Sequence, residues 1–159
     1  MNCHSPTFQI RAGAIAAALA VIFGAFAAHG LDGFLLKKYD GVTKIVHGQE
    51  IPGAVKYMAD FKTAAEYQMY HGLALLMVGL LALHRQSSAL NWAGKFFLIG
   101  ILLFSGSLYL LVLTGVRGLG AVTPFGGVAF ILGWIALCLG SGCLTCPTGQ
   151  TPPAENHDV

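Results

Sequence analysis

The chain has 159 residues, of which 55% are hydrophobic and only 10% are charged, and its formal net charge is +2 at pH 7. Because a soluble domain carries about 25% charged residues, this composition excludes an ordinary soluble fold. The small net charge and the lack of long runs of like charge argue against nucleic acid as a partner.

Apolar stretches along the chain predict four transmembrane helices. A bilayer core about 30 Å thick takes about 20 mostly apolar helical residues, since no water there satisfies the backbone. The predicted spans are about 10–28, 66–84, 95–114 and 124–144. We therefore predict an all-α, polytopic membrane protein, an antiparallel four-transmembrane-helix bundle over 10–144. A tail precedes it at 1–9, and a disordered tail follows at 145–159.

The first span also resembles a cleavable secretory signal. Ala25-Phe26-Ala27 fits an A-x-A cleavage site, and Arg11 fits a basic n-region. However, the apolar run is longer than that of a usual signal. Small residues also recur at every fourth position, at Ala16, Ala20, Gly24 and Ala28. Such a stripe lets a neighbouring helix approach closely, so we favour a retained helix.

The extended first loop has recognisable local patterns. Leu31 to Tyr39 predicts a short interfacial helix with Leu31, Phe34 and Leu35 on one side. Residues 43–51 predict a small hairpin that ends at Pro52-Gly53. From Ala54 the apolar period becomes helical, which predicts an amphipathic helix that leads into the second span.

Four strings carry a family resemblance when they are read together. The chain reads GAFAAHG at 24–30, FKTAAEYQMYHGLALL at 61–76, GILLFSGSLYLLVLTG at 100–115 and LGAVTPFGGVAFILGW at 119–134. In this order they resemble the small four-helix inner-membrane proteins of domain-of-unknown-function family four-two-three, which has a related transmembrane protein in animal mitochondria. The resemblance implies the bacterial inner membrane, or the mitochondrial inner membrane if the source is eukaryotic. It implies no activity or cofactor, because the family has none established.

The first loop departs from the family pattern, because residues 39–54 look like an insertion in a normally shorter segment. Long connections without a structural task are uncommon in compact domains. This one carries the apolar residues Ile45, Val46 and Ile51. We therefore predict that the segment docks against a partner chain or against the protein's own membrane surface.

The ends of the predicted spans place polar residues at one face of the membrane. In an antiparallel bundle, the end of span one, the start of span two, the end of span three and the start of span four lie together. Ionisable residues near the membrane tend to face the bundle interior in pairs. The candidate site is therefore a polar layer of His29, Glu66, Tyr67, Gln68, Tyr70, His71, Thr114 and Thr123.

This polar layer is compatible with more than one role. Two histidines could ligate haem iron or another metal, and Glu66 with His71 could relay protons. The plainer alternatives are histidines that hydrogen-bond a neighbour and a Glu66 that pairs with Lys62. If the layer is structural, replacing His29 or His71 by Ala should lower the melting temperature.

Other polar and small residues predict helix packing. Ser105 and Ser107 should bond a carbonyl one turn earlier or the next helix. Thr123-Pro124 reads as an N-cap followed by the first helical residue. Besides the stripe of the first span, the expected packing positions are Gly106, Gly126, Gly127 and Gly133.

Cys143 and Cys146 form a C-x-x-C that could oxidise, or bind a metal with His157. Because no thioredoxin-like context surrounds this motif, we expect unreactive thiols and no metal site.

The basic residues predict the orientation. Loops one and three carry Lys37, Lys38, Lys44, Lys56, Lys62 and Arg117, whereas the opposite side carries Arg11, Arg85 and Lys95. The excess favours cytoplasmic loops one and three, with both termini outside.

The chain lacks the usual catalytic motifs, such as H-E-x-x-H and G-x-S-x-G. We therefore expect a non-enzymatic membrane protein, an accessory or structural subunit in the lipid bilayer that contacts a membrane-protein partner or forms a homo-oligomer. The alternative is a small transporter of protons, ions or a metabolite that uses the polar layer around His29, Glu66 and His71. A haem or metal redox protein is a third hypothesis. Spans one, three and four carry no charge deeper than the headgroups, which favours the accessory role.

Overall fold

The computed structural model describes residues 4–85 and 87–141, and it is mostly helical. The elements are α1 His4–His29, α2 Leu31–Lys38, β1 Thr43–Val46, β2 Gln49–Pro52, α3 Gly53–His84, α4 Ser88–Gly100, η1 Ile101–Gly106, α5 Ser107–Thr114, η2 Arg117–Ala121 and α6 Thr123–Ser141. The predicted C-x-x-C motif, His157 and the tail at 145–159 lie outside the described residues.

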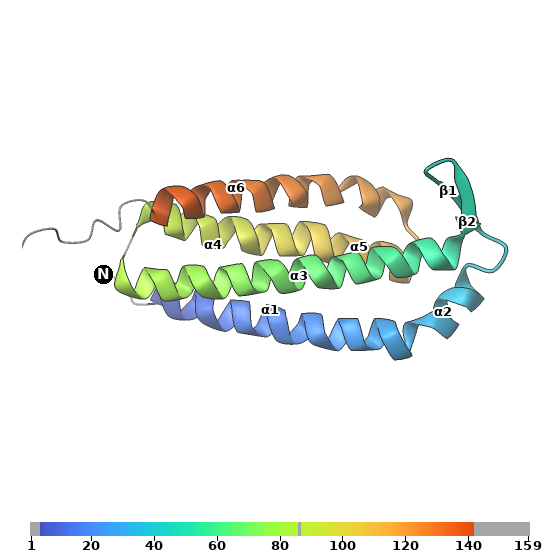
Figure 1. Ribbon diagram of the computed structural model, residues 1–159, viewed down its shortest axis with the longest axis horizontal. Helices are drawn as coiled ribbons and strands as arrows, with labels where there is room; N and C mark the ends of the chain where they lie inside the picture. The colour runs from blue at the N-terminus through green and yellow to red at the C-terminus, as the bar shows by residue number, and fades with distance from the viewer. Residues whose placement is uncertain (1–3, 86, 142–159) are drawn as a thin grey trace, which may run out of the picture.

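The long helices lie side by side along the length of the molecule (Figure 1). Helix α1 packs along α3, and α4 packs along α6, while α3 also contacts α4, η1 and α5. The hairpin and α2 lie together at one end (Figure 1). Helix α1 includes residues 4–9, which the sequence analysis assigned to a tail before the first span.

Among the described residues, three helical segments are long and apolar enough to cross a membrane, namely Pro6–His29, Ser88–Thr114 and Arg117–Ser141. The predicted membrane character of the chain is therefore confirmed. Helix α3 does not meet the same criterion. Its first half carries Lys56, Asp60, Lys62 and Glu66, so its continuous apolar stretch is short.

The short helix and the hairpin predicted in the first loop are both present. Strand β1 pairs antiparallel with β2, with Thr43 opposite Pro52 and Val46 opposite Gln49. His47 and Gly48 form the turn with positive φ angles of 51° and 79°, which is the backbone that two-residue hairpin turns favour. In α2, Leu31 and Leu35 are buried, but Phe34 is 45% exposed. Phe34 was expected beside them, yet only the Leu31–Leu35 row of this short helix faces the core.

Tyr39 connects the first loop to the end of the third rod, which is the continuous helical segment formed by α4, η1 and α5. Its hydroxyl donates a hydrogen bond to the Val112 carbonyl of α5 at 2.9 Å. Its ring stacks on Tyr57 of α3 with 4.1 Å between centroids. Burial, with a smaller contribution from Tyr57, raises the pKa of the Tyr39 phenol above its usual value. The phenol therefore keeps its proton, and with it the bond to α5.

The third rod is not a uniform α-helix. The π-helical segment η1 lies between α4 and α5, although the sequence predicted a single regular span. Insertions of this kind are frequent at functional sites. The segment packs against both α3 and α6. The rod ends where Gly115 adopts a left-handed conformation with φ of 81°, which is a common helix stop.

Helices α1 and α3 approach each other closely at Gly13 and Gly72. A Cβ on Gly13 would lie 2.6 Å from the Gly72 carbonyl oxygen, so the two backbones leave no room for a side chain. Of the predicted small-residue stripe, Ala20 is buried and Ala16 is half-buried, whereas Ala28 is exposed. A Cβ on Gly24 would meet no atom within 4 Å. The stripe therefore covers only part of the contact.

The packing glycines predicted in the third rod and in α6 also include both close-contact and open positions. A Cβ on Gly126 would lie 2.4 Å from the Phe104 amide nitrogen, and one on Gly133 would lie 2.6 Å from the Phe97 ring. Both are therefore true contact positions between α6 and the third rod. A Cβ on Gly127 would meet no atom within 4 Å, and one on Gly106 would meet only the Ile101 carbonyl oxygen, at 3.9 Å.

Replacing Gly13 by Ala should separate α1 from α3 and destabilise the protein by about 1–3 kcal/mol, the usual cost of overpacking a tight contact. Gly24→Ala on the same helix is the matched control, because it adds the same methyl group in open space. It should be neutral, or stabilising by up to about 1 kcal/mol through helix propensity. Thermal unfolding in a mild detergent measures both, and equal effects would contradict the assigned contact.

Candidate functional site

The structure separates the residues of the predicted polar layer. Five of them are exposed, namely His29, Glu66, Tyr67, Tyr70 and Thr114. Tyr67 is 39% exposed, Thr123 is half-buried, and Gln68 and His71 are each only 5% exposed. Gln68 and His71 point inward because they lie three residues apart on α3 and share a face. The buried members therefore form three local contacts and not one layer.

The first contact joins α3 to α1. The Gln68 side-chain nitrogen donates a hydrogen bond to the Ala16 carbonyl at 2.9 Å. A buried amide is costly unless it is hydrogen-bonded, so this bond both satisfies Gln68 and holds it beside the tight glycine contact.

The second contact joins α5 to α6. The Ser107 hydroxyl donates to the Phe104 carbonyl at 3.0 Å and lies 2.9 Å from the Thr123 hydroxyl. The expectation that Ser107 bonds a carbonyl one turn earlier or the next helix is confirmed, and Ser107 does both. The same expectation for Ser105 is wrong, because its buried hydroxyl has no hydrogen-bond partner among the described residues. The N-cap role predicted for Thr123 is wrong, because Thr123 is itself the first residue of α6. The 3-10 segment η2 runs almost directly into α6, and the Thr123 hydroxyl turns toward Ser107 and the Leu119 carbonyl instead.

The third contact is made by His71, which uses both ring nitrogens. Its Nδ1 lies 2.8 Å from the Tyr67 carbonyl oxygen, and its Nε2 lies 3.2 Å from Trp134 Nε1. A carbonyl only accepts and an indole N–H only donates. The imidazole therefore carries its proton on Nδ1, accepts at Nε2 and is neutral. The expectation of a histidine that hydrogen-bonds a carbonyl is confirmed.

An open cleft of about 610 Å³ lies beside His71, between α3, η1 and α6. It is lined by Tyr67, Tyr70, His71, Phe104, Phe130 and Trp134, together with Gly127 and Ile131. The Phe130 ring stacks on the imidazole with 3.4 Å between centroids. We call this site the aromatic cleft. Its volume falls within the range of about 300–1,000 Å³ that is typical of ligand pockets.

The sequence analysis missed three aromatic members of the cleft, namely Phe104, Phe130 and Trp134, as well as Ile131. Phe130 and Trp134 are four residues apart, so they share one face of α6. This spacing was a detectable signal for an aromatic face. It did not indicate that the face would meet His71, because that depends on how α6 is rotated against α3.

Glu66 and His71 do not form the predicted carboxylate–imidazole pair. They are five residues apart on α3, which at about 100° per residue directs them to different sides of the helix. Glu66 is exposed, whereas His71 is buried. In the part of the chain that the structure describes, no three His, Cys, Asp or Glu residues gather in a way that could hold a metal ion.

Replacing His71 by Ala should lower the stability by about 1–3 kcal/mol, because removal of the buried imidazole leaves the Trp134 N–H without its acceptor. His29→Ala is the matched control and should be nearly neutral, because His29 is exposed. This corrects the expectation that both replacements would destabilise. Melting temperatures in a mild detergent measure the difference, and an equal loss in the two variants would contradict the contact described for His71.

Comparison with known proteins places the chain in a family. Residues 23–127 match the family model described as protein of unknown function DUF423. A UPF0382 membrane protein of Staphylococcus epidermidis is 47% identical over 127 residues, which cover 80% of this chain and 88% of that protein. The UPF0382 membrane protein YwdK of Bacillus subtilis is 44% identical over 126 residues, which cover 79% of this chain and 88% of that protein. No solved structure matches the chain. The chain therefore belongs to the DUF423 family, whose relatives named here are bacterial membrane proteins.

Proposed function

We propose that this protein is a non-enzymatic accessory or structural component of a larger assembly in the bacterial inner membrane. The observation that carries the proposal is the saturated hydrogen bonding of His71. A histidine that relays protons must bind and release a proton at an accessible ring nitrogen. Protonation of His71 at Nε2 would break the bond from Trp134, so the arrangement supports a structural role.

The distribution of charge supports the same role. The charged residues of α3 end at Glu66, and those of the other long helices, such as Arg11 and Lys95, lie about two turns after the start of their helix. Ion and proton pathways usually place ionisable groups deeper in the membrane. The transporter hypothesis therefore has less support than the accessory role.

We further propose that α3 crosses the membrane as a fourth span in an antiparallel bundle. Its 32 residues extend about 48 Å at 1.5 Å per residue, which exceeds a hydrocarbon core of about 30 Å. Its packing neighbours α1, α4 and α5 cover much of its surface. A helix shielded in this way needs less apolar surface than one that faces lipid on every side.

A pair of reporters tests this topology. One is inserted at the His47-Gly48 turn of the hairpin and the other follows Val159. Loops one and three should be cytoplasmic and the termini outside, so only the hairpin reporter should have cytoplasmic activity. A third reporter, placed between α3 and α4, should resemble the terminal one. Hairpin and α3–α4 reporters on the same side would show that α3 does not cross.

The aromatic cleft is the surface that best suits an apolar group of another membrane component. Tyr70 and Ile131 are exposed at its rim, and Trp134 is 46% exposed although its N–H bonds His71. Exposed aromatic side chains gathered around a cleft mark contact sites more often than isolated exposed residues do. A membrane-protein partner or a second copy of this chain is the kind of occupant that the proposal requires.

Native purification in a mild detergent tests the accessory role directly. The protein should recover with a partner, or with a second copy of itself, in a fixed ratio. Ile131→Trp, which fills the cleft rim without touching His71, should reduce that recovery, whereas Ile135→Trp, on the same helix outside the cleft lining, should not. The same preparation placed in vesicles should show no proton flux. Flux above that of empty vesicles, or a Soret band in the absorption spectrum, would favour the transporter or the haem protein.

A further inference from the structure

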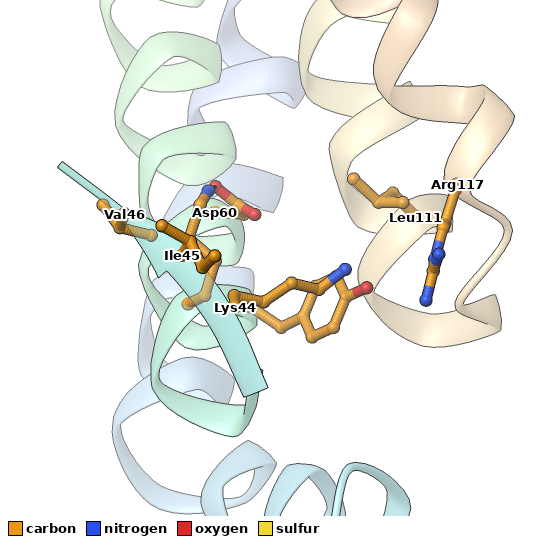
Figure 2. Close-up of a pocket in the computed structure, with 8 residues that line it drawn as sticks. Lys44, Ile45, Val46, Asp60, Leu111 and Arg117 are labelled. Carbon is orange, nitrogen blue, oxygen red and sulfur yellow. Dashed lines mark hydrogen bonds and ion pairs between the residues drawn. The ribbon is translucent and has the colours of Figure 1, made fainter. Parts of the chain in front are cut away.

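A second pocket, smaller than the aromatic cleft, lies next to the hairpin. It has a volume of about 260 Å³, and β1, the start of α3 and the α5–η2 region surround it. Its lining includes Lys44, Lys56, Tyr57, Asp60, Leu111 and Arg117. Figure 2 shows Lys44 on one side of this space and Arg117 on the other. We call it the basic pocket.

The charges of the basic pocket do not cancel. Lys56 and Asp60 form an ion pair with each other, so the single carboxylate of the lining is already engaged. Lys44 lies over the Tyr57 ring, with its Nζ 5.4 Å from the ring centroid. Among the described residues, neither Lys44 nor Arg117 pairs with a carboxylate. Two cations without counter-charges therefore face one small space, which favours an anion between them.

The surroundings of the basic pocket indicate a membrane interface. Ile45 is 80% exposed and Val116 is 56% exposed, and each is next to one of the unpaired cations in sequence. The aliphatic side chain of Leu111 forms part of the pocket wall. Apolar side chains beside cations suit the headgroup region, where both the acyl boundary and lipid phosphates are within reach. Bulk water would favour neither the exposed Ile45 nor Val116.

We propose that the basic pocket binds the phosphate group of an anionic phospholipid. The guanidinium of Arg117 can donate two parallel hydrogen bonds to phosphate oxygens, and the Lys44 ammonium supplies a second charge-assisted donor. The pocket is slightly below the volume of about 300 Å³ at which ligand pockets usually begin. This size suits a headgroup whose acyl chains remain in the bilayer.

This proposal assigns a role to the segment 39–54. Of the two targets predicted for it, a partner chain or the membrane surface, the unpaired cations favour the membrane surface. The proposal is independent of the aromatic cleft and of the accessory role, because it uses a different set of residues at the end of the molecule that carries the hairpin.

Binding of short-chain phosphatidylglycerol to the full-length protein in a mild detergent tests the site. The pocket variant carries Lys44→Gln and Arg117→Gln. The control variant carries Lys37→Gln and Lys62→Gln, which remove the same charge from exposed cations outside the lining. Native mass spectrometry measures bound lipid, and melting curves verify that both variants fold. Short-chain phosphatidylcholine and inorganic phosphate serve as separate ligands.

The pocket variant should bind phosphatidylglycerol at least about 100-fold more weakly, because each lost charge-assisted hydrogen bond to the phosphate contributes about tenfold or more. The control variant should keep most of the affinity, and phosphatidylcholine should bind the original protein more weakly than phosphatidylglycerol. Equal losses in the two variants would show that lipid binding depends on general surface charge and not on this pocket, which would overturn the proposal. Equal binding of phosphatidylcholine, or full displacement of the lipid by equimolar inorganic phosphate, would also overturn it.

Discussion

The close contact of α1 with α3 is the interaction on which the rest of the structure depends. Lipid is as apolar as the helices themselves, so helices associate in a membrane through tight packing and hydrogen bonds more than through the hydrophobic effect. Gly13 and Gly72 allow the two backbones to touch, and the Gln68 bond to the Ala16 carbonyl adds a polar link within the same contact. Once α3 lies against α1, its opposite side is available to α4, η1 and α5.

This central position of α3 explains where its polar side chains lie. The residues that point between helices, Gln68 and His71, have partners on α1, α3 or α6. Those that point outward, such as Glu66 and Tyr70, are exposed. An unsatisfied polar group is expensive where no water can reach it. The buried hydroxyls of Ser105 and Tyr109 have no hydrogen-bond partner among the described residues, whereas on α3 the requirement for a partner is met at Gln68 and His71. The tautomer of His71 follows from this requirement, since one neighbour accepts and the other donates.

The two surface features of the protein differ in chemistry and therefore in their expected ligands. The aromatic cleft lies between α3, η1 and α6 and exposes ring surface, and its His71 and Trp134 ring nitrogens are already bonded. The basic pocket lies under the hairpin and presents cations without carboxylate partners among the described residues. An apolar group is matched to the first and an anion to the second. The segment 39–54 thus contributes Lys44 to a charged site, whereas the aromatic cleft presents mainly apolar surface.

The amino-acid sequence alone determined the membrane location, the approximate helices, the hairpin and the family, because these depend on local apolar length, turn residues and motif strings. Tertiary structure decided which side chains meet. The period of apolar residues shows that a helix has a buried face, but it does not show how that helix is rotated against its neighbours. For this reason the predicted layer from His29 to Thr123 divided into separate contacts, and Gly13 replaced Gly24 as a packing position. The bond between His71 and Trp134 joins residues that are 63 positions apart, and only the packing of α6 against α3 brings them together.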